Sequence, residues 1–257
     1  SPGVDGKHGD RHSMPLFNLA WKDRFFWDGR AASLREQALH PIQDPLEMDQ
    51  HLPELMQKLR KHDAYPALFK AAFASGEISA TNLSLAIENF VLTVTSFDSA
   101  FDRAQRGKAK LSDEATRGFK LFFTEFEPRM GKRGADCFHC HGGAFFTDHQ
   151  FHNNGLRDNT DSGLQRTTSK PQDAGKFSTP SLRNVGITAP YMHDGRFQTL
   201  EEVLRHYSEG IHSSPTLDPN LAKHGGNLNL STNDIRDLVA FLQSLTDAKY
   251  LASSISE

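Results

Sequence analysis

This sequence of 257 residues contains only two cysteines, Cys137 and Cys140. Two thiols cannot supply a four-thiolate zinc site, so that class of protein is excluded. Tryptophan and tyrosine are also scarce, with 2 and 4 residues, whereas phenylalanine occurs 19 times. The chain therefore has enough apolar material for a core, and phenylalanine supplies most of its aromatic side chains.

An excess of charge of one sign and long apolar runs are lacking as well. The formal net charge is −3, which gives no reason to expect a nucleic-acid partner. No run approaches the roughly 18 apolar residues of a membrane span, so we expect no membrane-spanning segment. The length suits one large domain or two ordinary ones.

The two cysteines stand in the segment Cys137-Phe138-His139-Cys140-His141. This is the C-x-x-C-H pattern that attaches a c-type haem: the thiols form two thioether bonds, and the histidine ligates the iron. The alternatives are a redox dithiol and half a zinc site, but no β-α-β pattern surrounds the motif and no second cysteine pair exists. We predict a covalent haem on Cys137, Cys140 and His141, with His139 as a spacer and no cysteine left for a structural disulfide.

Apolar periodicity and capping residues predict an all-α fold of helices and long wrapping loops. No strand pattern or repeat is present. The turn-rich segment 142–190 is predicted to be a long loop, and such loops are usually functional or held by a ligand. Helices are predicted from Ser33 to Leu39, where Pro41 ends the first one, and then over 49–62, 64–75 and 80–104, from Ser112, from Thr199 to about Glu209, and from Ser231.

The helix after the long loop offers a second ligand for the haem iron. Its apolar face is formed by Leu200, Val203, Leu204 and Tyr207, so Tyr207 projects from the face that we expect to meet the haem. Tyr207 could instead be an ordinary core aromatic residue. His206 lies one residue off this face, and Met192, in the preceding loop, is the alternative ligand.

Several further stretches run in order along nearly the whole chain, and with them the sequence resembles the bacterial di-haem cytochrome c peroxidases. Within that family it is most similar to the MauG-like branch. The matching stretches are 26–34, Gln37, Pro41, Gln43, 46–48, 137–143, 181–185, 188–195, 199–202 and 240–246.

The resemblance implies two haem domains. Residues 1–106 would be the remainder of the N-terminal, peroxidatic domain, and residues 107–257 would be a C-terminal cytochrome c-like domain. The turn-rich start suggests a missing upstream segment, and we expect a second C-x-x-C-H haem before Ser1. In the family register, the sixth ligand of the C-terminal haem is nineteen residues after Thr188, which is Tyr207. MauG-like proteins carry tyrosine there, and conventional peroxidases carry methionine.

The resemblance also implies catalytic roles in the first part of the chain. Trp27 matches the tryptophan that carries electrons or holes between the haems, and Glu47 matches the acid–base group of the peroxide pocket. Gln37 and Pro41 match residues that line this pocket. Without the resemblance, Trp27 reads as a buried loop anchor and Glu47 as a surface carboxylate.

A calcium ion between the haems is implied as well. Thr188 and Pro190 match its backbone-carbonyl ligands, and carbonyl oxygen suits this hard cation. His12 occupies the position of the family's third contributor, an asparagine, so the sequence departs from the pattern there.

The leading functional hypothesis is a periplasmic oxidoreductase that uses hydrogen peroxide. Its electrons would come from a small electron-donor protein or from an oxidisable residue of a protein substrate. The periplasm is expected because c-type haem is normally attached outside the bacterial cytoplasm. The alternatives are a conventional di-haem cytochrome c peroxidase and an electron-transfer cytochrome c module without peroxide chemistry.

Overall fold

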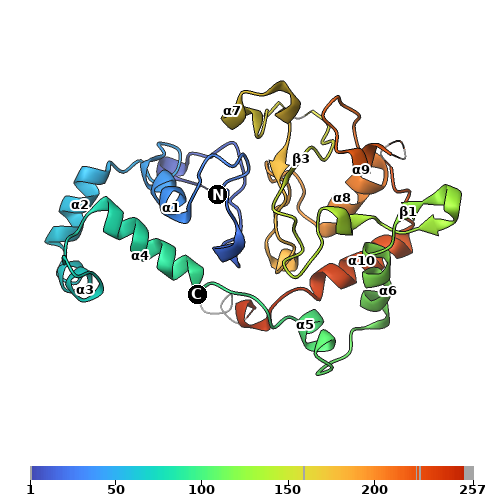
Figure 1. Cartoon of the computed structure of the whole chain (residues 1–257), viewed down its shortest axis with the longest axis horizontal. Helices are drawn as coiled ribbons and strands as arrows, with labels where there is room; N and C mark the ends of the chain where they lie inside the picture. Colours follow the sequence, from blue (N-terminus) through green and yellow to red (C-terminus); the bar gives the residue numbers. More distant parts are fainter. Residues whose placement is uncertain (1, 159, 224, 226, 252–257) are drawn as a thin grey trace. The chain divides into compact units, whose positions relative to one another are not determined.

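The computed structural model describes residues 2–158, 160–223, 225 and 227–251, and helices dominate its regular structure (Figure 1). The expected segment before Ser1 lies outside the described residues. The α-helices are α1 (Leu34–Gln43), α2 (Leu52–Lys61), α3 (Tyr65–Ala72), α4 (Ala80–Leu92), α5 (Ala100–Gln105), α6 (Asp113–Phe122), α7 (Gln165–Thr168), α8 (Leu200–Arg205), α9 (Pro219–Ala222) and α10 (Thr232–Gln243).

Four strands of two residues each accompany the helices in the described part of the chain. They are β1 (Phe126–Glu127), β2 (Lys132–Arg133), β3 (Phe151–His152) and β4 (Phe177–Ser178). β1 pairs with β2 and β3 with β4, both antiparallel. The helical class is thus confirmed in its coarse form, and the short strands are an addition that the sequence did not predict. No helix among the described residues is long and apolar enough to cross a membrane.

The chain divides into two compact units, Ser1–Thr95 and Ser96–Glu257, called here the N-terminal and C-terminal units. This division falls before the boundary at 106 and 107 that the family resemblance implies, and it places α5 in the C-terminal unit. The implied boundary concerns haem domains and stays a prediction.

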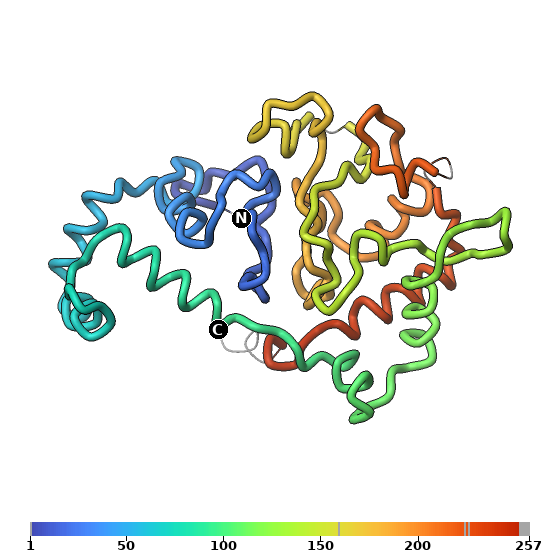
Figure 2. Tube along the Cα trace, in the orientation of Figure 1, coloured from blue at the N-terminus to red at the C-terminus, as the bar shows by residue number. Residues whose placement is uncertain are grey.

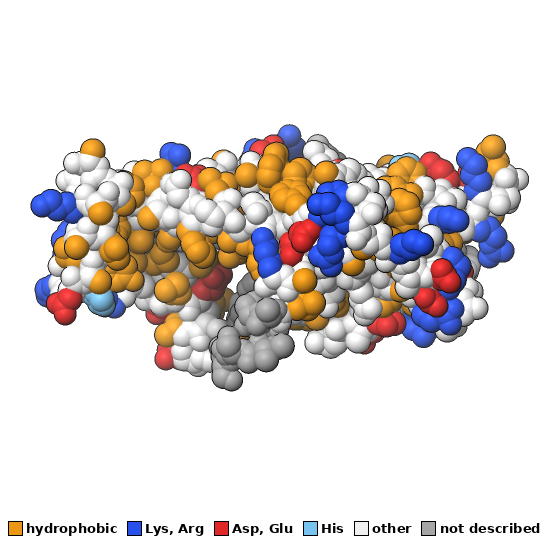
Figure 3. All heavy atoms as spheres, turned by 90° about the horizontal axis from the view of Figure 1, so that it is seen from below, with side chains coloured by type: hydrophobic (Ala, Val, Ile, Leu, Met, Phe, Trp, Pro, Cys, Tyr) orange, Lys and Arg blue, Asp and Glu red, His pale blue; other side chains and the backbone are white. Residues whose placement is uncertain are grey.

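The N-terminal unit is built on the packing of α1 against α4. One small core contains Phe25, Leu34 and Val91, and a second lies between α2 and α3. Some large apolar side chains of α3 and α4 stay at the surface. Leu68 is 58% exposed and Phe90 is 67% exposed, and Figure 3 shows apolar side chains gathered over this part of the unit.

The C-terminal unit is organised by the crossing of α6 and α10, which are far apart in sequence and lie side by side (Figure 2). Gly118 makes the crossing possible, because a Cβ atom there would lie 1.9 Å from the Asp237 carbonyl oxygen. The predicted inner face of the last helix is confirmed as buried. The core contains Phe122, Phe146, Leu200, Leu204, Ile235, Leu238, Val239, Phe241, Leu242 and Leu245.

The predicted helix over 80–104 is wrong as a single element. α4 ends at Leu92, and α5 starts after Ser99, whose side chain and Asp102 form a capping box. The segment between them is rich in β-branched and hydroxyl residues, and the division between the two units falls within it. The apolar side chains that recur at helical spacing over 80–104 therefore pack in the cores of two different units.

Two predicted helix ends are also corrected. α1 continues through Pro41 to Gln43. Proline has no N–H to donate, but the helical hydrogen bonding continues after it, since the Asp44 N–H donates to the His40 carbonyl oxygen at 3.0 Å. After Thr199, the α-helix ends at Arg205 and a π-helical turn, His206–Gly210, follows. The caps predicted at Ser112, Thr199 and Ser231 are confirmed, and each side chain accepts a hydrogen bond from the first turn.

Candidate functional site

The C-x-x-C-H segment forms a tight turn at the start of the long irregular region. Residues Cys137–His139 make one 3₁₀ turn, and the His141 N–H donates to the Cys137 carbonyl oxygen at 2.9 Å. Both cysteines are free thiols and keep partial solvent contact. The segment therefore presents two sulfurs and one imidazole from a single turn.

His141 is oriented by a backbone carbonyl group five residues later in the chain. Its Nδ1 lies 3.0 Å from the Phe146 carbonyl oxygen, which accepts a hydrogen bond when the ring N–H resides on Nδ1. Burial lowers the pKa of His141, although the hydrogen bond to Phe146 opposes this. A neutral imidazole whose second nitrogen is fixed by a carbonyl is the state in which histidine ligates iron.

The thiols do not resemble those of a redox dithiol. Burial raises the pKa of Cys137 and of Cys140 to about 12 in each case, and nearby carboxylates add to the effect. Catalytic dithiols instead have lowered pKa values. Among the described residues, no group of three potential metal ligands contains both cysteines. The redox-dithiol alternative therefore loses support, whereas Cys140 does lie in one such group, with Asp148 and His152.

Tyr207 lies in the π-helical turn and belongs to the same site. Burial raises its pKa to about 12; a hydrogen bond from the Asn154 side chain opposes this, and the Cys140 and Cys137 thiols add to the rise. π-Helical turns are rare and often occur at functional sites. The structure thus brings Tyr207 to the cysteine side of the unit.

Met192 is also near Asn154, whose Nδ2 lies 3.4 Å from the Met192 sulfur. Its backbone is in the left-handed region, with φ 71°. Asn154 was missed by the sequence patterns, because an asparagine in a turn-rich loop carries no periodic or motif signal. Thr188 and Pro190 lie in the turn before Met192, and calcium there stays a prediction.

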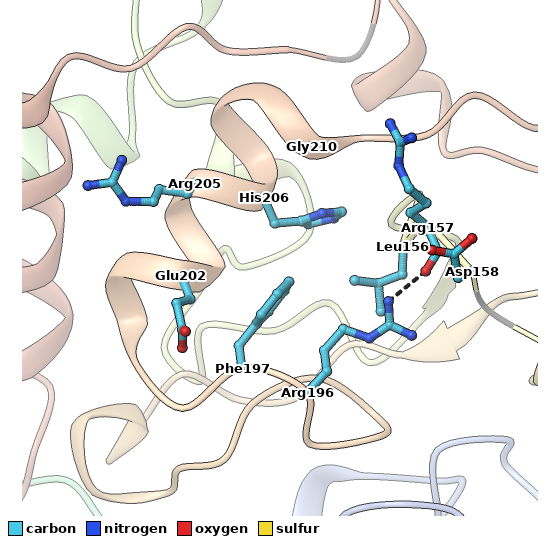
Figure 4. Close-up of a pocket in the computed structure, with 9 residues that line it drawn as sticks. All are labelled: Leu156, Arg157, Asp158, Arg196, Phe197, Glu202, Arg205, His206 and Gly210. Atoms are coloured by element: carbon cyan, nitrogen blue, oxygen red, sulfur yellow. Dashed lines mark hydrogen bonds between the residues drawn. The ribbon is translucent and has the colours of Figure 1, made fainter.

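His206 serves a different part of the unit. It is buried, and its Nε2 donates to the Asn154 carbonyl oxygen at 2.9 Å. It points into a separate pocket of about 420 Å³ (Figure 4). In this pocket, the Arg196 side chain donates a hydrogen bond to the Arg157 carbonyl oxygen. The lining residues are Leu156, Arg157, Asp158, Arg196, Phe197, Glu202, Arg205, His206 and Gly210.

Two charged clusters flank the motif. His152 bonds Asp148 through Nε2 at 2.8 Å and Asp218 through Nδ1 at 2.6 Å. These bonds raise the pKa of His152 to about 9, so its ring is cationic at neutral pH. The second cluster places His139 Nε2 3.1 Å from Asp136, which also pairs with Lys223 at 2.7 Å. His139 thus lies beside carboxylate groups, and its role as a spacer stays a prediction.

The N-terminal unit holds the other predicted residues. Trp27 is buried, and its indole N–H donates to the His12 carbonyl oxygen at 2.8 Å. The adjacent Asp28 is buried and pairs with Arg11 at 2.6 Å and with Arg30 at 3.1 Å. Trp27 is therefore held rigidly by its neighbours.

The residues predicted for a peroxide pocket are less enclosed. Glu47 is exposed, yet burial of part of its carboxyl group and the charge of Asp44 raise its pKa. Gln37 and Pro41 both lie on α1, one turn apart. The Met48 N–H donates to the Pro41 carbonyl oxygen at 3.1 Å, so the loop that carries Glu47 is joined to α1 at Pro41.

Taken together, the donor set of the C-terminal unit fits a covalently bound haem. One turn supplies two sulfurs and an oriented neutral imidazole, the thiols act on the pKa of the Tyr207 hydroxyl, and all four side chains keep partial solvent contact. A mainly helical unit with this site defines the class of c-type haem proteins.

Comparison with known proteins agrees with this class. A family model described as di-haem cytochrome c peroxidase matches residues 1–110. Methylamine utilization protein MauG of Methylorubrum extorquens is 38% identical over 239 residues, which are 91% of this chain and 64% of that protein. Cytochrome-c peroxidase IdrP1 of Denitromonas iodatirespirans is 32% identical over 280 residues, covering 96% of this chain and 71% of that protein.

A solved structure matches as well. The crystal structure of a MauG-like protein associated with microbial copper homeostasis has a TM-score of 0.84 at 35% identity, covering 98% of this chain and 80% of that one. The chain belongs to the di-haem cytochrome c peroxidase family, whose members are peroxidase-type oxidoreductases with c-type haem. It spans about two thirds of the length of the relatives that it matches.

Proposed function

We propose that this chain forms the second haem site, and part of the peroxide site, of a periplasmic MauG-like oxidoreductase that uses hydrogen peroxide. The observation that supports the proposal is the C-x-x-C-H turn, in which the Phe146 carbonyl oxygen orients the His141 ring, together with Tyr207, whose pKa the Cys140 and Cys137 thiols help to raise. A c-type haem bound here would supply one-electron redox chemistry. Cys137 and Cys140 would hold it covalently, and His141 and Tyr207 would ligate its iron.

The choice of ligands decides what this site does. An anionic tyrosine oxygen favours ferric and higher oxidation states of iron, whereas methionine favours the reduced state. A His/Tyr pair therefore suits a site that shares or relays oxidising equivalents.

The N-terminal unit would contribute to the site where peroxide reacts. Trp27 is buried and fixed by its bond to the His12 carbonyl oxygen, which suits a residue that passes electrons or holes. The raised pKa of Glu47 suits a carboxyl group that takes and returns a proton. Gln37 and Pro41 would line the same pocket.

The proposal includes the whole protein's arrangement. Residues 1–106 and 107–257 would belong to two haem domains, with the second haem attached upstream of Ser1. Calcium would be bound by the carbonyl oxygens of Thr188 and Pro190. The reductant would be a small electron-donor protein or an oxidisable residue of a protein substrate.

A conventional di-haem cytochrome c peroxidase is the second candidate. Two observations favour it: the similarity to proteins named cytochrome c peroxidase, and the position of the Met192 sulfur close to the same asparagine as Tyr207. An electron-transfer module without peroxide chemistry is the third, and it would require that Glu47 have no role.

The test uses the full-length, haem-loaded protein. Tyr207→Phe should change the ferric absorption spectrum and the electron paramagnetic resonance spectrum, and intact mass should show two haems. An unchanged spectrum in Tyr207→Phe, or a methionine-to-iron charge-transfer band in the unaltered protein, would reject the His/Tyr site. Peroxide added to the fully ferric protein separates the branches: reaction without prior reduction supports the MauG-like proposal, and a requirement for reduction supports the conventional peroxidase.

A further inference from the structure

A histidine and two carboxylates meet beside the C-x-x-C-H turn without being joined by hydrogen bonds. His139 Nε2 lies 3.1 Å from Asp136 Oδ1 and 3.4 Å from Glu125 Oε1. His139 Nε2 and Asp136 Oδ1 are both buried, and neither has a hydrogen-bond partner among the described residues. The Asp136 side chain is only 7% exposed. Buried polar atoms without such partners call for an explanation, and an ion that the two atoms share provides one.

The geometry explains why these short distances are not hydrogen bonds. A hydrogen-bond acceptor lies close to the axis of the N–H group that donates to it. The ligands of one metal ion instead surround a point in front of the nitrogen, and so they lie off that axis. With bonds of about 2.1 Å, two ligand atoms are about 3.0 Å apart at a right angle and about 3.4 Å apart at the tetrahedral angle. The distances from His139 Nε2 to the two oxygens fall in this range, and all three atoms lie within 4.8 Å of one another.

The backbone fixes the two carboxylate-bearing segments against each other. The Gly134 N–H donates to the Glu125 carbonyl oxygen at 3.0 Å, and the Asp136 N–H donates to the Thr124 carbonyl oxygen at 3.1 Å. A Cβ atom at Gly134 would lie 1.8 Å from the Thr124 carbonyl oxygen, so the close approach of the two segments requires glycine. The carboxylates are therefore held near each other by the main chain before any ion binds.

Lys223 contacts the same carboxylates at their other oxygens. Its Nζ lies 2.7 Å from Asp136 Oδ2 and 3.4 Å from Glu125 Oε2. Asp136 Oδ1 and Glu125 Oε1 are thus left for the side of the cluster where His139 lies. The ammonium charge offsets one of the two carboxylates, and the other remains to attract a cation. Ligands that are themselves oriented by outer partners are the usual arrangement in protein metal sites.

The other histidine–carboxylate cluster next to the motif provides a contrast. Both ring nitrogens of His152 have a hydrogen bond, to Asp148 at 2.8 Å and to Asp218 at 2.6 Å. A ring that is bonded in this way at both nitrogens has no lone pair to offer to a metal ion. Nε2 of His139 has no such bond, although two carboxylate oxygens lie within 3.4 Å of it.

We propose that Glu125, Asp136 and His139 form a binding site for one divalent transition-metal ion, represented by Zn²⁺. Zinc takes imidazole nitrogen and carboxylate oxygen at about 2.0–2.2 Å, whereas calcium and magnesium take oxygen ligands. Three protein ligands leave a fourth position for water. The site uses neither cysteine and not His141, so it is separate from the haem site and does not depend on the proposed function.

The experiment measures Zn²⁺ binding to the full-length, haem-loaded protein by isothermal titration calorimetry after treatment with EDTA. One site should be present, and His139→Gln, Asp136→Asn and Glu125→Gln should each weaken its affinity about tenfold or more, since loss of an outer partner alone costs about 10–100-fold. X-ray absorption at the zinc edge should show nitrogen and oxygen neighbours at about 2.0–2.2 Å and no sulfur at about 2.3 Å. Absence of binding, unchanged affinity in any of the three variants, or a sulfur neighbour would overturn the proposal.

His152→Gln and His62→Gln are the controls. His152 also lies between two carboxylates, and His62 is an exposed histidine of the N-terminal unit. Both variants should bind Zn²⁺ with the affinity of the unaltered protein, and weaker binding in either would place the ion elsewhere and overturn the proposal. Glu125 is 39% exposed and lies outside the C-x-x-C-H motif, so Glu125→Gln keeps the test decisive if the other ligand variants fail to fold or to take up haem.

Discussion

Replacing Asp102 by asparagine should destabilise the C-terminal unit strongly. The Asp102 carboxylate accepts two bonds from Arg183, at 2.9 Å and 3.1 Å, and also bonds Ser99 in the capping box of α5. The side chains are enclosed, with 4% of Arg183 and 11% of Asp102 exposed. Asparagine keeps the shape and one acceptor oxygen, but it leaves the guanidinium charge buried and uncompensated.

The expected loss follows from this geometry. Removing one partner of a buried ion pair costs about 3–5 kcal/mol, and the remaining acceptor oxygen places Asp102→Asn near the lower end, at about 3 kcal/mol. Arg183 also donates from Nε to the Ala144 carbonyl oxygen at 2.8 Å, two residues before Phe146, whose carbonyl orients His141. The variant should therefore also loosen the histidine side of the haem site.

Urea unfolding of the haem-loaded protein, followed by circular dichroism, measures the loss. Asp98→Asn is the matched control, because Asp98 is 64% exposed and pairs with two arginines at the surface, where an ion pair contributes at most about 1 kcal/mol. Asp102→Asn combined with Arg183→Met removes both charges and should recover part of the stability. Equal unfolding midpoints for Asp98→Asn and Asp102→Asn would refute the reasoning.

The ion pair of Asp102 and Arg183 also predicts that the C-terminal unit loses stability at low pH. Burial raises the pKa of Asp102, but hydrogen bonds from Arg183 and Ser99 outweigh it and lower the pKa overall. A lowered pKa gives stability that is present above the unfolded value of about 3.9 and is lost as the pH falls through the folded value. Asp102→Asn should lose this part of the acid dependence.

Two further predictions concern stability. Gly118→Ala should cost about 3 kcal/mol in urea unfolding, because the new Cβ would meet the Asp237 carbonyl oxygen at 1.9 Å, and a loss below about 1 kcal/mol would show that α6 and α10 can separate freely. The bonds from His152 to Asp148 and Asp218 raise its folded pKa to about 9, above the unfolded value of about 6.5. Its contribution, about 3 kcal/mol, is therefore complete below pH 6.5 and is lost as the pH rises through 9. A His152→Gln variant with the same alkaline profile as the unaltered protein would contradict this.

Some features of this protein are encoded locally, and the sequence predicted them correctly. The caps at Ser112, Thr199 and Ser231 depend on side chains that bond a backbone group three residues away, so a short window contains all the information. The buried face of α10 follows from helical spacing in the same way. The C-x-x-C-H turn is likewise defined within five residues.

Other local predictions failed where tertiary structure overrode them. The apolar stripe over 80–104 is continuous in sequence, but it is shared between two units, so the helix breaks after Leu92. Pro41 lies inside α1, because one missing hydrogen bond is offset by the surrounding structure. In both cases the packing of the whole unit outweighed a local signal.

The candidate site itself divides in the same way. Cysteine spacing by itself predicts where a haem would attach, and helix periodicity points to Tyr207, because both are short-range patterns. Only the tertiary structure brought Asn154 to Tyr207 and Met192, over sequence distances at which no local periodicity operates. The physical reason is that a hydrogen bond across a loop depends on how the chain packs in three dimensions. The residues next to the donor in the sequence do not indicate that the bond will form.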